Sequence, residues 1–478
     1  MMSRFKQLGL VLCGMCLGVL VSLQFAANAN REGGATPQLP VDEVRSLADV
    51  FNHIKQLYVE PVEDKKLIND AISGMVAGLD PHSQFLDEEA FKDMQISIKG
   101  KFGGLGIEVS MEDGLVKVVS PIEDTPAFRA GIKSGDLIFK LDDTPVRGLT
   151  LTDAVKRMRG KPGTSINITI VRKGETKPLE FTLVREEIQV QSVKSKLIEP
   201  GYGYVRVAQF QEQTTADLAR HLDKLYKDGP LKGLVLDLRN NPGGLIDAAV
   251  GVSAAFLPAK SLVVYSEGRI PDARRKYHAE ASEYSRGSED ALKSLPKGVK
   301  TVPMVVIVNG GSASASEIVA GALQDYKRVK VLGIRSFGKG SVQSIFPIIQ
   351  GQTGVKLTIA KYFTPLGRSI QAKGIDPDFQ VDETPNGSSE PFYREADLTR
   401  HLANPTEQSA PAASASAPAA KPAKNGRKPE ADEPPARFEP AGAGDYQFEQ
   451  AMNLLKGKPV AVVKSEVAEP AAEASQPK

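Results

Sequence analysis

Short apolar segments of strand type alternate with helix-type segments from Gly203 to Ile334. Strands are expected at 204–207, 233–238, 262–265, 304–308 and 329–334, and helices at 214–227, at 245–256 and after residue 314. Strands that alternate with helices predict an α/β core. The composition agrees, since 41% hydrophobic and 25% charged residues exclude a fibrous or wholly disordered chain.

Charge and cysteine content exclude several classes of function. The 60 Lys and Arg residues against 58 Asp and Glu residues give a net charge of +2, so no basic field favours nucleic acid as a partner. The two cysteines, Cys13 and Cys16, lie in the first apolar stretch, and the five histidines are scattered. We therefore expect no metal site and no cofactor, and no disulfide outside that stretch.

The N-terminus has the pattern of an export signal. Arg4 and Lys6 precede an apolar run, Leu8–Phe25, and Ala27–Ala29 has the small residues of a signal-peptidase site. Residues 1–29 are therefore expected to be a signal peptide. A retained membrane anchor is the alternative, because the apolar run is close to the roughly 20 residues that span a bilayer.

Composition and periodicity divide the rest of the chain. Apolar residues at helical spacing come first, followed by a compact module of short strands with one amphipathic helix, and then by the α/β core. Pro, Ala, Ser and Lys dominate the C-terminal part, which predicts disorder around one helical island. The expected regions are 41–99, helical; 100–188, the module; 189–382, the core; 383–445, a disordered linker; 446–457, a docked helix; and 458–478, a disordered tail.

The module at 100–188 begins with a glycine-flanked loop, since Gly103–Ile107 reads GGLGI. A lone string of this kind usually closes a tight turn, but with the strands and helix that follow it resembles a PDZ domain. The resemblance implies that the loop binds a peptide's terminal carboxylate while the peptide adds as a strand beside the helix. The peptide-binding residues that it implies are Leu105, Gly106, Ile107, Leu151, Val155 and Met158.

A segment of small residues, Gly310–Ala320, lies between the apolar strand at 304–308 and the next helix. Ser314 and Glu317 fit a capping box, S-x-x-E, at the start of that helix. A serine at a helix N-terminus also lies where free N–H groups, such as that of Ala315, can stabilise an oxyanion. Both interpretations need the same geometry, so Ser314 alone does not separate a structural role from a catalytic one.

A serine nucleophile needs a base, and no histidine lies in a patterned segment near it. The remaining candidate is Lys339, because a lysine buried between glycines can lose its proton near neutral pH. An exposed turn lysine is the alternative. Gly333–Lys339 also fulfils G-x-x-x-x-G-K, but Gly340 replaces the magnesium-binding Ser or Thr, so a phosphate-binding loop is not expected.

A third segment, Asp237–Leu245, turns from an apolar strand into a helix. It is either an ordinary strand-to-helix turn or the source of a second oxyanion donor, from Gly243 or Gly244. The sequence leaves the choice between the two glycines open.

Four features in this order resemble the C-terminal processing peptidases, also called tail-specific proteases. They are the PDZ-like module, RNNPGGL at 239–245, GSASASEI at 311–318 and FGKGSVQ at 337–343. The resemblance covers about residues 41–382. It implies an α/β core of the crotonase and caseinolytic-protease type, with an inserted PDZ domain, an N-terminal helical region and a disordered Ala/Pro-rich tail.

The family also implies roles for single residues. It separates its serine and lysine by 25 positions, as Ser314 and Lys339 are separated, which favours Ser314 over Ser312 and Ser316. By the same resemblance, Gln343 orients the lysine and Asp325 has an auxiliary role. The implied oxyanion donors are the amides of Ala315 and of Gly243 or Gly244.

The implied function is that of a Ser-Lys endopeptidase that captures unstructured, apolar C-termini of protein substrates. The resemblance further implies an exported protein, in the bacterial periplasm or at the periplasmic face of the inner membrane. It implies a homodimer built by the N-terminal helices and the C-terminal island, and it leaves an adaptor protein as an open question. Arg172 is a candidate link between the module and the core. The competing hypothesis is a catalytically silent PDZ-type peptide-binding scaffold.

Overall fold

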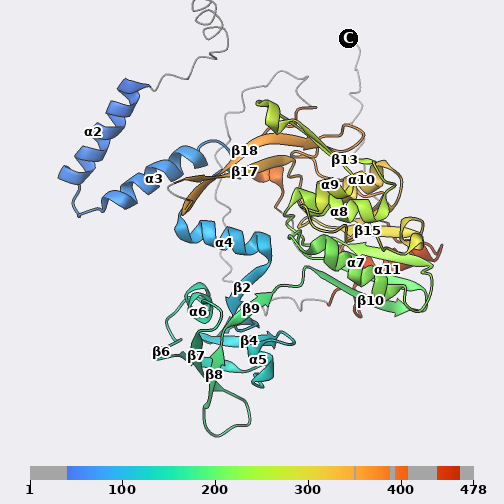
Figure 1. Ribbon diagram of the computed structural model, residues 1–478, viewed down its shortest axis with the longest axis horizontal. Coiled ribbons are helices and arrows are strands. Elements are labelled where there is room, and N and C mark those ends of the chain that lie inside the picture. Colours follow the sequence, from blue (N-terminus) through green and yellow to red (C-terminus); the bar gives the residue numbers. More distant parts are fainter. Residues whose placement is uncertain (1–39, 349–350, 388–392, 407–438, 463–478) are drawn as a thin grey trace, which may run out of the picture. The chain divides into compact units, whose positions relative to one another are not determined.

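The computed structural model describes residues 40–348, 351–387, 393–406 and 439–462 (Figure 1). The expectations of a signal peptide or anchor at 1–29 and of disorder at 407–438 and 463–478 lie outside these residues. Among the helices of the described ranges, none combines the length and the hydropathy that a membrane span requires. The chain divides into two compact units, residues 1–72 and 73–478.

The first unit contains the helix α2 (Val41–Leu57) and most of α3 (Asp64–Ala77). Acidic residues in the first turn of α2 and Lys55 in its last turn complement the helix dipole. No residue of α2 is buried, and its apolar stripe is 42–60% exposed at Val41, Val44, Leu47 and Val50. An amphipathic helix with an uncovered apolar face is typical of segments that pack against another chain.

The second unit is built on a six-stranded sheet. Its strands in sheet order are β10 (Val193–Glu199), β11 (Tyr202–Val207), β12 (Gly233–Asp237), β15 (Met304–Val308), β16 (Lys330–Gly333) and β19 (Phe379–Gln380). All neighbouring strands run parallel except the edge strand β10, which is antiparallel to β11. Every residue of β12 and β15 is buried, as in a sheet covered on both faces. The α/β core that the sequence predicts is therefore present.

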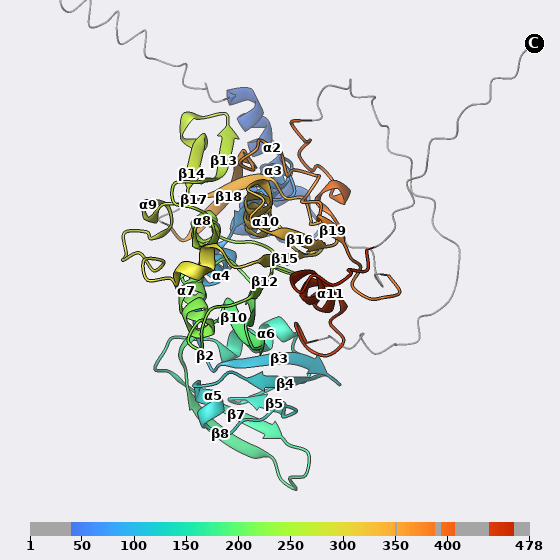
Figure 2. The same cartoon turned by 90° about the vertical axis from the view of Figure 1, so that its right-hand side faces the viewer.

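Three helices pack on one face of this sheet: α7 (Thr214–Leu225), α8 (Ile246–Phe256) and α10 (Ala315–Asp325) (Figure 2). Successive residues of a strand point to opposite faces, so Val306 and Val308 of β15 contact these helices. Val305 and Ile307 contribute to a separate cluster on the other face. β15 is therefore packed on both faces, and α10 packs in the cluster on one of them. The turn between β15 and α10 thus joins two elements of the core.

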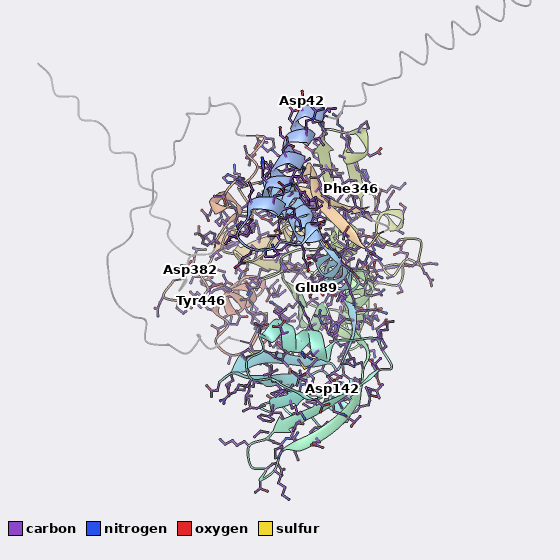
Figure 3. All side chains as sticks on the ribbon, turned by 90° about the vertical axis from the view of Figure 1, so that its left-hand side faces the viewer. Asp42, Glu89, Asp142, Phe346, Asp382 and Tyr446 are labelled. Atoms are coloured by element: carbon purple, nitrogen blue, oxygen red, sulfur yellow. The ribbon has the colours of Figure 1, made fainter. Side chains whose placement is uncertain are left out.

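The other face of the sheet is covered by α11 (Tyr446–Leu455), the helical island that the sequence predicts at 446–457. Phe448, Ala451 and Met452 pack against this face. Gln447 Nε2 donates a hydrogen bond to the Val381 carbonyl, 2.9 Å away. In Figure 3, Tyr446 and Asp382 accordingly lie side by side. The island thus docks on the core as expected.

A buried ion pair joins α11 to the end of β12. Arg239 is 2% exposed, and its guanidinium donates to both oxygens of Asp445, at 2.7 and 2.6 Å, and to Asp237. We expect Asp445→Ala to lower the free energy of unfolding by about 3 kcal/mol, because one of the two carboxylates that neutralise this buried cation is lost. Chemical denaturation measures the change. The matched control is Glu449→Ala, an exposed residue of the same helix, and equal effects of the two variants would contradict the expectation.

A second sheet contains the segment after the lysine. It consists of β1 (Gln84–Leu86), β18 (Thr353–Phe363), β13 (Leu262–Gly268) and β14 (Arg275–His278), with β17 (Ser341–Ile348) paired to the other edge of β18. Phe346, labelled in Figure 3, lies on β17 and is 45% exposed. The strand β1 interrupts the region 41–99 that the sequence predicts as helical, so that expectation is wrong for residues 84–86. The helix α4 (Glu88–Lys99) then follows, capped by Asp87.

The module is a small β-structure with two helices. Its sheet order is β3 (Ile107–Glu112), β4 (Leu115–Pro121), β5 (Leu137–Leu141), β7 (Ser165–Val171) and β8 (Leu179–Val184), and β6 (Thr144–Pro145) pairs with β5. The helices are α5 (Pro126–Arg129) and α6 (Leu151–Met158). A ribbon of β2 (Lys101–Gly104) and β9 (Glu186–Gln189) brings the two ends of the module together. The remaining short elements are η1 (Pro271–Ala273), α9 (Ala281–Tyr284), η2 (Lys297–Lys300) and η3 (Glu395–Asp397).

Residues 393–406 belong to the core, although the sequence places them in a disordered linker. The Glu395 side chain is fully buried, accepts a hydrogen bond from Gln371 Nε2 at 2.9 Å and contacts His82 Nε2 at 2.7 Å. Asn404 Nδ2 donates to the Gln371 carbonyl at 2.8 Å. The linker expectation is therefore wrong for this segment, because its polar side chains are buried with partners that a composition cannot show.

Candidate active site

Ser314 is the N-cap of α10, at the turn where β15 ends. Its φ of 56° and ψ of −113° are unusual for a residue with a side chain, and such strain occurs where surrounding contacts fix the backbone. The segment before it consists of small residues, which allows the chain to turn sharply. Ser314 is only partly buried, so its hydroxyl lies at the edge of the core.

The neighbouring serines have structural contacts. Ser312 Oγ donates to the Leu238 carbonyl at 2.8 Å, and Ser316 Oγ donates to the Asn241 carbonyl at 2.9 Å. Both serines are fully buried. Their hydroxyls hold the turn after β12 against the turn before α10, which leaves Ser314 as the partly accessible serine of the three.

The buried carboxylate of Glu317 joins the serine segment to the lysine segment. Its Oε2 accepts hydrogen bonds from the backbone amides of Ser314, at 2.8 Å, and Lys339, at 2.9 Å. Its Oε1 accepts from Ser336 Oγ at 2.6 Å and from the Gly338 amide at 2.7 Å. Burial raises the pKa of Glu317 to about 7 despite these bonds. The capping box predicted from the sequence is thus also the bridge that brings Ser314 and Lys339 together.

Lys339 extends its amine into a largely buried position. Lys339 Nζ donates to Gln343 Oε1 at 2.5 Å and to the Ser341 carbonyl at 3.3 Å. Burial, assisted by the charge of Lys356, lowers the pKa of Lys339 to about 8. The neutral amine is therefore accessible at mildly alkaline pH, and the alternative of an exposed turn lysine does not hold.

Of the two glycines after β12, Gly243 lies against Ser314 and Gly244 lies against Phe210. A Cβ atom on Gly243 would come within 2.7 Å of Ser314 Cβ and 3.0 Å of the Ala315 nitrogen, so only glycine allows this approach. The Gly243 N–H donates to Asn241 Oδ1 at 2.9 Å. The Phe210 N–H donates to the Gly243 carbonyl, and the Leu245 N–H donates to the Phe210 carbonyl. In this parallel bridge the N–H of Gly244, between them, points away from Phe210. The Ala315 N–H, at the first position of α10, has no acceptor within its helix.

Tyr362 is a site residue that sequence reasoning missed. It lies on β18, is 2% exposed, and donates its hydroxyl hydrogen to the Lys339 carbonyl. The Ser314 side chain lies close to the same hydroxyl. A lone tyrosine in a strand carries no sequence signal for this contact, since it depends on the pairing of β17 with β18.

Asp325 lies at the opposite end of α10 from Ser314. Its carboxylate accepts from Arg368 Nη2 at 2.5 Å and from the Leu366 amide at 2.8 Å. It therefore holds the turn after β18 and makes no contact with the lysine or the serine in these bonds.

The loop before β3 turns at a glycine and leaves backbone amides without partners among the described residues. Gly106 has a φ of 75°, and a Cβ atom there would lie 2.2 Å from Thr125. Within the described part of the chain, the amides of Leu105 and Gly106 donate no hydrogen bond. β3 is an edge strand of its sheet, so its outer side can accept an added strand. Ile107 begins that strand.

The other residues predicted to bind peptide divide between core and surface. Met158 and Leu105 are buried in the core of the module, while Leu151, Val155 and Ile107 pack partly buried against it. Arg172 donates to both oxygens of Asp136, at 2.7 and 2.8 Å, and to the Gly131 carbonyl at 2.9 Å. These bonds lie inside the module, so the expected link to the core is wrong.

The backbone amides of Ser314 and Lys339 share Glu317 Oε2, and a serine with a lysine of lowered pKa in one such network is typical of serine peptidases. The module at 100–188 adds a peptide-binding type of fold. Residues 201–381 match the model of peptidase family S41, residues 103–183 that of the PDZ domain and residues 21–90 that of the activating protease CtpB N-terminal domain. The chain belongs to peptidase family S41, which confirms the predicted family, fold class and enzyme type.

Two curated relatives that match most of the chain show the family. A carboxy-terminal-processing protease of Bartonella bacilliformis is 45% identical over 370 residues, which cover 77% of this chain and 81% of the relative. The carboxy-terminal processing protease CtpA of Bacillus subtilis is 34% identical over 400 residues, or 84% and 81% of the two chains. A solved photosystem II D1 C-terminal processing protease is 32% identical over 71% of this chain and 86% of its own, with a TM-score of 0.40.

Proposed function

We propose that the protein is a Ser-Lys endopeptidase that binds the C-terminus of a protein substrate through its PDZ domain. The observation that carries the proposal is the shared carboxylate oxygen: Glu317 Oε2 accepts from the amides of both Ser314 and Lys339. A catalytically silent scaffold would need neither this bridge nor a lysine with a pKa lowered to about 8.

The proposed reaction begins with neutral Lys339. Its amine accepts the proton of Ser314 Oγ as that oxygen attacks the scissile carbonyl carbon. The resulting ammonium donates to Gln343 Oε1 and to the Ser341 carbonyl, and it then protonates the leaving amine as the peptide bond breaks. A water molecule, deprotonated by the same lysine, hydrolyses the acyl-enzyme and restores Ser314.

The negative charge of the tetrahedral intermediate needs two hydrogen-bond donors. The Ala315 amide is one, because it is the free first amide of α10. The second is the amide of Gly243 or Gly244, and the geometry favours Gly244, because the Gly243 amide already donates to Asn241 Oδ1. Asp325 has a structural part in this scheme, since its carboxylate bonds Arg368 and Leu366.

The PDZ domain supplies substrate selection in this proposal. The free amides of Leu105 and Gly106 would bind the terminal carboxylate, and the peptide would pair with β3 beside α6. The partly buried side chains of Ile107, Leu151 and Val155 would then contact the peptide and favour apolar terminal residues.

Export and self-association belong to the same proposal. The signal pattern at 1–29 and the bacterial relatives support a protein in the periplasm or at the periplasmic face of the inner membrane. The exposed apolar stripe of α2 supports a homodimer, and an adaptor could use the same helices. The size of the protein in solution, with and without residues 41–57, tests the dimer.

C-terminal selection can be tested with one model protein in three forms. We expect an unstructured, apolar C-terminus to be cleaved about tenfold faster than the same tail ending in Asp-Asp or in an amide. The amide removes the carboxylate that the loop binds, and the two aspartates place charge against apolar side chains. Equal cleavage rates for the three tails, measured on gels under single-turnover conditions, would contradict this selection while leaving the peptidase assignment intact.

A further inference from the structure

The turn Asp80–Ser83, which precedes β1, reaches the hydrogen-bond network of the catalytic lysine. Asp80 and Ser83 are each 4% exposed. Asp80 Oδ1 accepts from the amides of His82 and Ser83, at 2.9 and 3.0 Å, and Oδ2 accepts from Ser83 Oγ at 2.6 Å. β1 then pairs with β18, which brings this turn beside Thr358.

The carboxylate fixes the direction of the next hydrogen bond. An ionised carboxylate can only accept, so the Thr358 hydroxyl must donate its one hydrogen to Asp80 Oδ1, 3.0 Å away. Although burial acts to raise the pKa of Asp80, its hydrogen bonds hold that pKa below the usual value, so the carboxylate stays ionised. Thr358 Oγ1 is then left as an acceptor.

Gln343 takes its orientation from that acceptor. Gln343 Nε2 donates to Thr358 Oγ1 at 3.1 Å and to Ser341 Oγ at 3.0 Å. With both amide hydrogens used in this way, Gln343 Oε1 faces Lys339 Nζ at 2.5 Å. In the reversed orientation the amide would present hydrogens to the ammonium, which has no lone pair to accept them.

We propose that Asp80 and Thr358 are positioning residues of the peptidase: they fix the amide of Gln343 so that its oxygen binds the Lys339 amine, which leaves the amine's lone pair for the proton of Ser314. This rests on the proposed Ser314–Lys339 mechanism. It makes a segment of the N-terminal region, more than 270 positions from Thr358 in the chain, part of the active-site machinery.

The test compares kcat, KM and pH–rate profiles of Thr358→Val and Thr358→Ser in the full-length protein, with a short peptide substrate. Valine keeps the shape and removes the acceptor, so kcat should fall about tenfold with KM unchanged. The acid limb of the pH–rate profile should move to lower pH. The Lys339 ammonium loses the stabilising hydrogen bond to Gln343 Oε1, which lowers the pKa of the lysine further. Serine keeps the hydroxyl and should restore both. Thr353→Val, on the same strand, is the control, since among the described residues its hydroxyl bonds the Ile348 carbonyl and no group of the lysine network.

The charged and titratable groups around the lysine are unchanged in these variants; they are Lys356, Glu395, Glu317, Asp80 and Tyr362. A second pair, Asp80→Ala and Asp80→Asn, decides the question if a Thr358 variant fails to fold. Asp80→Ala should lower kcat. Asp80→Asn keeps an oxygen that accepts from the His82 and Ser83 amides and from the Thr358 hydroxyl, so it should retain most of the activity.

A folded Thr358→Val protein with the wild-type kcat and pH profile, or a Thr358→Ser protein as impaired as valine, would overturn the positioning role. If Ser314→Ala is inactive in the same assay, either of these outcomes rejects the positioning role of Asp80 and Thr358 and leaves the proposed function intact. If Ser314→Ala is active, the proposed function fails with it.

Discussion

Ser314→Ala should abolish peptide cleavage, with a loss of at least about 10³-fold in kcat. The variant removes the attacking oxygen and leaves the backbone bonds of residue 314 to Glu317 in place. Loss of a cap hydroxyl costs about 1 kcal/mol of stability, so circular dichroism must accompany the assay.

The neighbouring serines provide the controls for this variant. Ser316→Ala loses the hydrogen bond to the Asn241 carbonyl. Ser312→Ala loses two, the bond to the Leu238 carbonyl and the bond that its oxygen accepts from the Asn309 amide. Such a bond contributes about 1 kcal/mol, so both variants should keep a substantial fraction of the activity. A folded Ser314→Ala protein with normal turnover would show that another residue is the nucleophile.

Lys339→Arg should bind C-terminal peptides and show a loss of about 10²–10⁴-fold in turnover. Arginine keeps the positive charge but cannot lose its proton in a protein, so it cannot accept the proton of Ser314. Lys339→Met is the second variant, because its uncharged side chain suits the buried position. Substantial turnover in either folded variant would exclude lysine as the base.

The wild-type pH profile follows from the same residue. Because the reactive form is the neutral amine and the pKa of Lys339 is about 8, the rate should rise with pH through about 8 and then level off. The folded pKa lies below the ordinary lysine value of about 10.4, so the ammonium destabilises the folded state below pH 8, and this penalty disappears as the pH rises toward 10. Lys339→Met should therefore be more stable than the wild type at neutral pH.

The core elements could be predicted because their signals are local. β12 and β15 are continuous apolar segments, and α7 has a clear helical period. β1 is three residues long and is a strand only because β18 lies beside it, so no local period could reveal it. The buried Glu395 stands in a segment of polar composition, which led to the wrong linker expectation.

The site was predictable only where its residues lie close in the chain or match a spaced motif. Ser314, Lys339 and Gln343 are predicted in that way, and Glu317 is assigned from the sequence to the helix cap. The contacts of Tyr362 with Lys339 and of Thr358 with Asp80 depend on how the strands of the second sheet pair. A single sequence carries no information on such pairing, so these residues could be identified only from the structure.

Covalent labelling tests the central claim most directly. A fluorophosphonate reacts with a serine hydroxyl that a base has activated. Mass spectrometry of the labelled, digested protein should place the label on Ser314 in the wild type and find no label on this residue in folded Lys339→Met. A preparation that cleaves substrate but carries the label on another serine, or that labels Ser314 equally without the lysine, would contradict the Ser314–Lys339 mechanism.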